Sequence, residues 1–476
     1  MAADLLNLAD LVVTWGGDDE QVEAVAWRAV KTMIRADVGR VESLSSAQVQ
    51  GVGIRVVMGA PSGSWGSGLG RDRRVRARQG FAYTTSLTEG ALRATLAEAR
   101  DNLAFATPDE HVGLAVPDGV PAAALGRLYR PEQQTVTTRA KIKMALELER
   151  AVRATDPRVF GVESAEYSDA VGEHCVVTST GIRASNQETA CYVVARALAA
   201  ERGQTQTGFG FSLGRHIDDL DVAAAASDAA RGATRRLGAT AAPAGRATLV
   251  LDPYVIAHLI SAVGAALTGD AVQRGRSLFA GRLGEAVASP LVTLVDDPTD
   301  PLAYTATRTD GEGLATRRNE LIRAGVLERF VHNSSTGRRA GLASTGSAVR
   351  SGFASTPTVA CMALALAPGA GTQADLIADA GDAVLITDVG GLHWGVNTAT
   401  GQLCIAAEGH RIASGEIAEP FRPFTVNTTV QTLLRNVVAV GADVRVIPTN
   451  ATGVTVAVAD IAVSGAEPEH DVNEAP

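Results

Sequence analysis

The chain contains 476 residues, of which 46% are hydrophobic and 20% are charged, a composition typical of folded globular proteins rather than of disordered chains. Its net charge is -9, so no overall electrostatic attraction draws it to phosphate backbones or anionic lipid, and nucleic acid is excluded as the expected partner. At about 150 residues per domain the length predicts roughly two or three domains, and we divide the chain into two.

The first residues and the cysteines indicate the cell compartment. The N-terminal stretch has no basic segment and carries Asp4 and Asp10 within its apolar run, which argues against a secretory signal. No stretch reaches the run of about 18 apolar residues that a membrane span needs. We therefore expect a cytoplasmic protein with no membrane partner. No CxxC pair indicates a zinc ribbon or a disulfide framework, and small buried side chains are expected for Cys175, Cys191, Cys361 and Cys404.

In the N-terminal half, strands and helices alternate. Residues 51–59 and 79–87 are rich in β-forming residues and partly alternating, which predicts two strands joined by a Gly/Ser-rich loop. Ser86 with Glu89 forms a capping-box pattern, and apolar residues at helical spacing follow it. A second amphipathic helix is predicted over residues 138–156, where it would cover one face of the sheet.

The next elements complete a mixed N-terminal domain. Three strands and an alanine-rich helix are predicted at 159–166, 175–178, 191–198 and 221–237. Hairpins combined with packed helices predict the α+β class, with an N-terminal domain of mixed β-sheet and packed helices over residues 1–240. The stretch 238–245 is built from small residues, contains Pro243 and lacks periodicity, so it is interpreted as a linker between domains.

The second domain, residues 246–466, is predicted to be β-rich and opened by one helix. A strand over 246–251 is followed by Asp252 and Pro253, the N-cap and first-turn residues of a helix to about Leu267. Residues 319–332 alternate around Ala324-Gly325, which is typical of a β-hairpin. A short helix is predicted over 374–380, with strands around Val384, Val396, Cys404, Thr425, Val444 and Val454. Residues 467–476 are predicted to be a frayed acidic tail.

Two motifs admit a chemical interpretation and a structural one. The GxSxG string at 210–214 would make Ser212 a hydrolase nucleophile on a sharp strand-to-helix turn. No apolar strand precedes it and no helix follows at once, so we interpret the segment as a glycine-rich turn or flap. The run Arg71 to Arg78 holds five arginines in eight residues, suited to an acidic peptide or a phosphate, but a solvated loop is favoured.

A metal centre has no local signature. No HExxH is present, and the eight histidines are scattered singly, so each is interpreted as a hydrogen-bonded structural residue. His174 and Cys175 are adjacent, but neighbours along a strand point to opposite faces and cannot chelate one ion.

One segment changes this interpretation. Residues 269–289 (GDAVQRGRSLFAGRLGEAVAS) resemble the stretch that follows the zinc helix in the TldD/PmbA family, a family of two-subunit zinc peptidases that was also named modulator of DNA gyrase. The likeness continues through residues 292–298, 311–324 and 390–416, and through 51–82 and 159–181 in the first half. It is collinear and covers nearly the whole chain.

The resemblance implies that this chain has lost the family's zinc ligands. Counting back from Gly269-Asp270, the positions of the family's HExxxH motif fall on Ile260, Ser261 and Ala265. The family's third ligand is a cysteine near the C-terminus, and the matching stretch 444–455 contains none. We therefore expect no catalytic residue, no metal and no cofactor in this chain, as in the TldE, or PmbA, branch of the family.

By the same resemblance, the chain is expected to be the non-catalytic subunit of a heteromeric zinc metalloprotease whose zinc lies in a TldD-type partner. The substrate would be an unfolded or leader-type peptide that binds as an added strand, and the β-rich second domain is the expected receiving edge. His393, Trp394 and Asn397 are candidates for substrate or partner contact. His258 precedes Ile260 by two positions, about 200° around a helix, so it does not replace the lost ligand.

Two alternatives remain open at this point. The chain is either a stand-alone peptide-binding or scaffolding pseudoenzyme, or an independent enzyme that uses His258, His393 or His410 as metal ligands or Ser212 as a nucleophile. The gyrase name suggests work on DNA, but the acidic charge balance gives no support for direct contact with nucleic acid.

Overall fold

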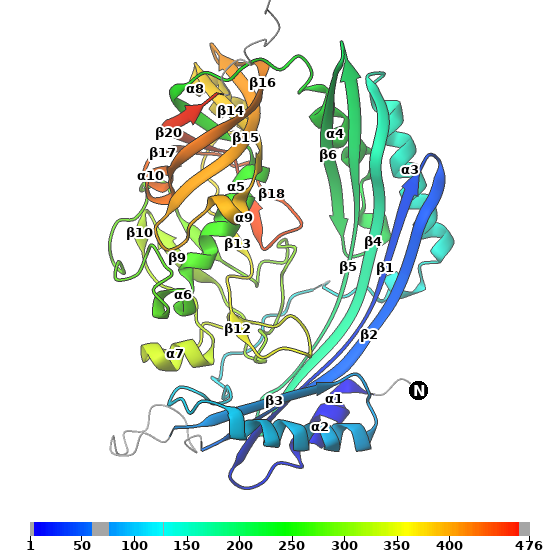
Figure 1. Cartoon of the computed structure of the whole chain (residues 1–476), viewed down its shortest axis with the longest axis vertical. Coiled ribbons are helices and arrows are strands. Elements are labelled where there is room, and N and C mark those ends of the chain that lie inside the picture. Colours follow the sequence, from blue (N-terminus) through cyan, green and yellow to red (C-terminus); the bar gives the residue numbers. More distant parts are fainter. Residues whose placement is uncertain (1–3, 60–75, 127, 466–476) are drawn as a thin grey trace, which may run out of the picture.

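The computed structural model describes residues 4–59, 76–126 and 128–465, and two bodies make up the molecule (Figure 1). A long, curved sheet with its helices forms one body, and the β-rich C-terminal half forms the other. The α+β class is therefore confirmed, whereas the division into domains stays a prediction. The predicted tail at 467–476 and residues 71–75 of the arginine run lie outside the described residues.

The N-terminal sheet has six antiparallel strands in the order β3-β2-β1-β4-β5-β6. Its strands are β1 (Glu20–Asp37), β2 (Arg40–Met58), β3 (Arg78–Thr84), β4 (Val159–Thr178), β5 (Arg183–Glu201) and β6 (Gln204–Gly214). Its helices are α1 (Leu5–Val13), α2 (Glu89–Asp101), α3 (Thr138–Thr155) and α4 (Val222–Thr234), with 3-10 turns at Asn102–Phe105, Pro131–Thr135 and Ile217–Asp219.

Several N-terminal predictions need correction. The two predicted strands at 159–166 and 175–178 are parts of one strand, β4, and neither α1 nor β1 was predicted. Helix α2 is capped by Thr88, whose hydroxyl accepts from the Ala91 amide, so the predicted Ser86 capping box is wrong. The predicted helix itself is confirmed, because apolar residues at helical spacing, such as Leu92 and Leu96, are buried in α2.

The predicted glycine-rich flap at residues 210–214 is wrong, because this segment is the end of strand β6. Its glycines serve close packing against α4. A Cβ atom at Gly210 would lie 2.0 Å from the Ala225 carbonyl oxygen, and one at Gly208 would lie 2.1 Å from that of Ala229. Only a residue without a side chain allows helix and strand to approach this closely.

The C-terminal half contains two six-stranded sheets. One runs β16-β15-β14-β7-β20-β17, and an extra pairing of β16 with β20 closes five of its strands into a ring. Its strands are β7 (Gly245–Leu251), β14 (Ala383–Gly390), β15 (Gln402–Ala413), β16 (Glu416–Thr429), β17 (Val437–Val440) and β20 (Val456–Ser464). The other sheet runs β10-β9-β8-β13-β19-β18, and β11 (Ala348–Val349) pairs with β12 (Thr358–Val359).

The strands of the second sheet and the helices make up the rest of the C-terminal half. The second sheet consists of β8 (Leu294–Asp296), β9 (Asn319–Arg323), β10 (Val326–Leu327), β13 (Leu364–Leu366), β18 (Arg445–Val446) and β19 (Ala451–Gly453). The helices are α5 (Pro253–Gly264), which a 3-10 turn (Ala265–Leu267) extends, α6 (Gly269–Gln273), α7 (Ser334–Ala340), α8 (Gln373–Ala380), α9 (Leu392–Gly395) and α10 (Val430–Arg435). No described helix is long and apolar enough to cross a membrane. The Asp252-capped helix and the hairpin at Ala324-Gly325 are confirmed.

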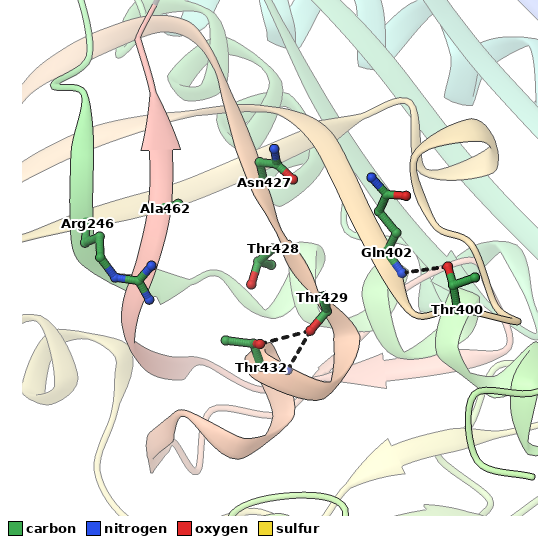
Figure 2. A pocket seen from close by; sticks show the side chains of 8 residues that line it. All are labelled: Arg246, Thr400, Gln402, Asn427, Thr428, Thr429, Thr432 and Ala462. Atoms are coloured by element: carbon green, nitrogen blue, oxygen red, sulfur yellow. Dashed lines mark hydrogen bonds between the residues drawn. The ribbon is translucent and has the colours of Figure 1, made fainter.

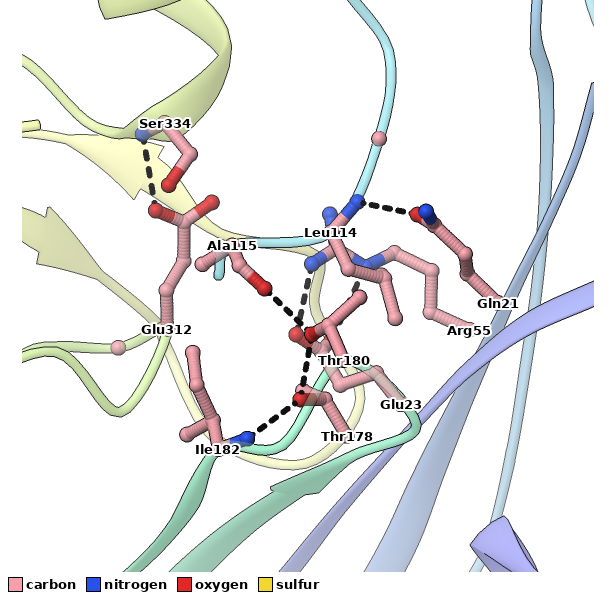
Figure 3. A network of polar contacts seen from close by, with 12 residues as sticks. Gln21, Glu23, Arg55, Leu114, Ala115, Thr178, Thr180, Ile182, Glu312 and Ser334 are labelled. Carbon is pink, nitrogen blue, oxygen red and sulfur yellow. Dashed lines mark hydrogen bonds and ion pairs between the residues drawn. The ribbon is translucent and has the colours of Figure 1, made fainter. Parts of the chain in front are cut away.

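A buried ion cluster joins the two bodies at one end of the molecule. The Glu23 carboxylate on β1 accepts two hydrogen bonds from Arg55 on β2, at 2.9 and 2.6 Å, and pairs with Arg350 of the C-terminal half. Burial by itself would raise the pKa of Glu23, but Arg350 and Arg55 outweigh it and hold that pKa below its ordinary value. Figure 3 shows Glu23 and Arg55 of this cluster together with Glu312, whose carboxylate accepts from the Ser334 amide at 2.9 Å.

Replacing Gly210 with alanine should destabilise the protein by about 3 kcal/mol, because the new methyl group overlaps the α4 backbone. Urea unfolding measures the change. The control is Gly90→Ala in α2, where nothing lies within 4 Å of the added atom, and stability should stay equal or rise by up to about 1 kcal/mol. Equal stability of the two variants would contradict the packing described for β6.

Candidate functional site

Helix α5 is the centre of the C-terminal half. The Asp252 carboxylate caps it by accepting from the Tyr254 amide at 2.8 Å, and Pro253 occupies its first turn. Most of its side chains are buried in the largest apolar core of the molecule, including Leu259 and Ile260. Burial on nearly every side explains why its sequence is apolar almost throughout.

One stripe of α5 is only partly buried. Tyr254, His258 and Ser261 follow one another at intervals of four and three residues, and the exposed Ala265 continues the stripe into the 3-10 turn. The Tyr254 ring lies 6.2 Å from the Phe209 ring on β6, measured between centroids. The N-terminal end of this stripe, at Tyr254, therefore faces the N-terminal sheet across the cleft between the two bodies.

Two polar side chains of this stripe, His258 and Ser261, have hydrogen-bond partners. His258 donates from Nδ1 to the Tyr254 carbonyl at 2.8 Å, and its ring packs 4.4 Å from that of Tyr254. The Ser261 hydroxyl donates to Oδ1 of Asn450 at 2.6 Å. His258 thus has a structural contact, and Ser261 is held by a residue 189 positions later in the chain.

Asn450 and Cys361 form hydrogen bonds that hold the C-terminal end of α5 in place. Asn450 donates from its amide nitrogen to the Cys361 carbonyl at 3.0 Å, and the Cys361 thiol contacts the Gly264 carbonyl at 3.5 Å. Burial raises the pKa of Cys361 well above its ordinary value, so the thiol stays protonated. A protonated, fully packed thiol is a poor nucleophile and a poor metal ligand.

Asp296 lies close behind this end of the helix. Its Oδ1 accepts from the amides of Met362 and Ala363, at 2.7 and 2.6 Å, and fixes the loop that carries Cys361. Burial raises the pKa of Asp296 to about 6, and its Oδ2 has no hydrogen-bond partner. This carboxyl group has a structural role in the loop.

A polar cavity of about 340 Å³ lies at the Tyr254 end of the stripe. Its floor is formed by Phe209 and Phe211 of β6, and Arg445 lies over the Phe211 ring at 5.3 Å. Most of its charged side chains are paired across the two bodies, as in the Arg445–Asp228 pair at 2.6 Å and the Arg236–Asp388 pair at 2.9 Å. The charged pairs that line this cavity therefore connect the two bodies directly.

A larger and more open pocket, of about 580 Å³, lies on strands β15 and β16 (Figure 2). Its lining consists of Arg246, Thr400, Gln402, Asn427, Thr428, Thr429, Thr432 and Ala462. These side chains include no histidine, cysteine or carboxylate, and hydroxyls and amides by themselves supply neither a general base nor a strong metal ligand.

The predicted contact residues lie around α9. Trp394 is 94% exposed, which is unusual for the largest aromatic side chain. Asn397 instead has a local role, because its Oδ1 accepts from the amides of Ala399 and Thr400 at 3.0 and 3.1 Å. His393 belongs to α9, so the predicted loop is a helical turn, and its side chain lies outside the described residues.

The side chains of the remaining predictions do not assemble into a reactive group. Ser212 lies in regular strand β6 and accepts from the Asp221 amide at 2.8 Å, so it does not occupy a nucleophile elbow. His410 contacts the Arg235 carbonyl at 3.1 Å, and burial lowers its pKa. Among the described side chains, no three His, Cys, Asp or Glu residues converge on one point. Cys404 is exposed, which corrects the prediction that all four cysteines are buried.

Comparison with known proteins gives a consistent result. The model of the PmbA/TldA metallopeptidase C-terminal domain matches residues 244–465, and the model of its central domain matches residues 131–237. A metalloprotease TldD homolog from Haemophilus influenzae is 28% identical over 390 residues, covering 79% of this chain and 76% of the relative. Metalloprotease PmbA of Escherichia coli O157:H7 is 25% identical over 370 residues, covering 77% and 79%.

A solved structure supports the fold. TldE from Thermococcus kodakarensis superposes with a TM-score of 0.82 at 19% identity, covering 96% of this chain and 99% of that one. The long curved sheet and the β-rich second body are therefore shared by both chains.

Replacing Ser261 with alanine should destabilise the protein by about 1–2 kcal/mol, because Oδ1 of Asn450 loses its donor in a half-buried place. Denaturant unfolding at neutral pH measures the loss. Alanine at the exposed Ser351 should change stability by less than about 0.5 kcal/mol. A Ser261→Ala variant as stable as this control would show that the contact contributes nothing.

Proposed function

This chain belongs to the PmbA/TldD metallopeptidase family, and from that premise we propose that it is the non-catalytic, TldE/PmbA-like subunit of a heteromeric zinc metalloprotease. The observation that carries the proposal is the chemistry of α5 and the 3-10 turn that extends it, where, by the resemblance, Ile260, Ser261 and Ala265 occupy the positions of the family's HExxxH motif. In this proposal the zinc and the catalytic base belong to a TldD-type partner, and the complex works in the cytoplasm.

The residues present do not fit a zinc ion. Zinc is held in proteins by thiolate, imidazole and carboxylate groups. Ile260 and Ala265 have no lone pair to offer, and the Ser261 hydroxyl donates to Asn450. Ile260 is also only 5% exposed within an apolar core, where an ion with its charge would be strongly disfavoured. No hydrolytic step is therefore assigned to this chain.

The contribution of this chain would be to bind and enclose an extended peptide. β6 is the last strand of its sheet and pairs only with β5 in the described part of the chain, so its outer edge can accept an added strand. Phe209 and Phe211 on this strand form the floor of the polar cavity. We therefore assign the receiving edge to β6, and not to the five strands of the second domain that the β16–β20 pairing closes into a ring.

The substrate class in this proposal is an unfolded or leader-type peptide. Main-chain hydrogen bonds to a strand edge require an extended segment and place few demands on its sequence. Trp394 would supply an apolar anchor, because its exposed ring offers a large contact area with little loss of conformational freedom. A folded domain has no free extended segment to offer to such an edge.

Co-expression with the TldD-type protein from the same source tests the assignment. The purified pair should cleave an unfolded peptide, whereas this chain alone should show no cleavage, because it lacks the ligands for the catalytic ion. The partner by itself is the control. Peptide binding without any association with that partner would favour a stand-alone binding or scaffolding protein, and cleavage by this chain with stoichiometric zinc would overturn the proposal.

Within an active pair, Trp394→Ala should lower kcat/KM for an unfolded peptide by about tenfold, mainly by raising KM, because an apolar anchor is lost and no reacting group changes. Steady-state kinetics measure the effect. Phe105→Ala is the matched control, because Phe105 is 88% exposed at the end of a 3-10 turn that follows α2. Equal kinetics for the two variants would remove Trp394 from the binding surface.

A further inference from the structure

One arginine of the polar cavity has no ionic partner. The cavity lies between α4, β6 and the C-terminal half, and Asp228, Arg231 and Arg235 line it at helical spacing. The Asp228 carboxylate pairs with both Arg231 and Arg445. In the described part of the chain, by contrast, no side chain forms an ion pair or a hydrogen bond with the Arg235 guanidinium.

The charge of Arg235 is not balanced by its surroundings. Burial and the neighbouring Arg231 lower the pKa of Arg235, and the opposite influence of Asp228 and Asp252 does not offset them. His410 on the same cavity wall adds no negative charge, since its Nε2 donates to the Arg235 carbonyl at 3.1 Å and burial keeps the ring neutral. An anion beside Arg235 would therefore stabilise this guanidinium.

The other charged side chains of the cavity already have contacts. Arg236 pairs with Asp388 and Glu408, at 2.9 and 2.7 Å. The Asp252 carboxylate is occupied as the cap of α5. Among the described residues that line this cavity, Arg235 is therefore the charged group that a ligand reaches without breaking an existing ion pair.

The size of the cavity limits what enters it. Pockets for small ligands span about 300–1,000 Å³, and this one, at about 340 Å³, lies at the lower end. Arg445 reaches Asp228 across the cavity, and Arg236 donates to the Thr207 carbonyl of β6 at 3.2 Å. The space therefore fits one end of a peptide on β6, or one of its side chains, rather than a strand that runs through.

We propose that this cavity binds a carboxylate of the peptide substrate, its C-terminal group or an acidic side chain, through the Arg235 guanidinium. The inference rests on the proposed function, because it takes the ligand to be the peptide that β6 receives. A guanidinium presents two parallel N–H donors that match the two carboxylate oxygens. A doubly charged phosphate is disfavoured, since Asp228 and Asp252 lie in the same cavity and repel the second charge more strongly.

Three labelled peptides of one unstructured sequence, without other acidic residues, test the inference. One has a free C-terminus, one a C-terminal amide, and one an amide with a single internal glutamate. Fluorescence anisotropy measures their affinity for this chain alone and for its pair with the TldD-type protein, after a chelator has removed the zinc. One of the two carboxylate peptides should bind at least about tenfold more tightly than the neutral amide, and the preferred one identifies the source of the carboxylate.

Substitutions assign this preference to one side chain. Arg235→Gln should remove it and leave the affinity for the neutral amide unchanged, which also shows that the variant is folded. Arg235→Lys should restore part of it, because the charge returns without the two parallel donors. Arg139→Gln, at an exposed position in the first turn of α3, is the matched control and should keep the full preference.

The outcomes separate this inference from the proposed function. Equal affinity of the wild-type chain for all three peptides, or an unchanged preference in Arg235→Gln, would overturn the inference and leave the proposed function standing. Absence of binding for every peptide, by the chain and by the pair, would overturn the proposed function and this inference with it.

Discussion

The constraint on which the molecule depends is the burial of α5. This helix lies in the apolar core of the C-terminal half, and its buried side chains pack against strands of both sheets there. Burying each large apolar side chain contributes about 1.5–3 kcal/mol, so the helix is a main source of stability for that half. A helix with this role presents only a narrow stripe to the cleft. The residues of that stripe therefore decide what chemistry α5 itself offers to the cleft.

The relation between the two bodies depends on a second buried contact. Glu23 is 1% exposed and is held by Arg55 of its own sheet and by Arg350 of the other body. Such a cluster is weak evidence of net stability, but removing one partner would leave an uncompensated charge in the interior. It therefore specifies one arrangement of the two bodies. At the polar cavity between β6 and α5, the Arg445–Asp228 and Arg236–Asp388 pairs join the same two bodies.

The sequence predicted elements with a clear local pattern and missed those decided by distant contacts. Helices α3 and α5 follow from apolar spacing and capping residues, and both were predicted. Strand β4 was divided in two because polar residues interrupt its apolar pattern. In the fold, Asp169 of this strand is buried against Lys141 at 2.6 Å and Gln133 at 2.7 Å, partners that no local pattern reveals. Strand β6 was predicted to be a turn or flap because it is rich in glycine. In the fold these glycines allow close packing against α4, a contact that only the tertiary structure shows.

The site was partly accessible from sequence. Family resemblance assigned Ile260, Ser261 and Ala265, and the fold places them on the central helix α5 and the 3-10 turn that extends it. No local sequence pattern indicates the hydrogen bond between Ser261 and Asn450, because 189 residues separate the two. The aromatic floor of Phe209 and Phe211 was equally hidden, since these residues lie in the segment interpreted as a flap. Asn397 was assigned to a contact surface, whereas its side chain accepts hydrogen bonds from its own turn.

The most direct measurement is a calorimetric titration of the isolated chain with zinc at neutral pH, with a TldD-type protein as the positive control. The account predicts no saturable, stoichiometric binding, because Ile260, Ser261 and Ala265 offer an ion no imidazole, thiolate or carboxylate. Tight, stoichiometric zinc binding by the isolated chain would contradict it.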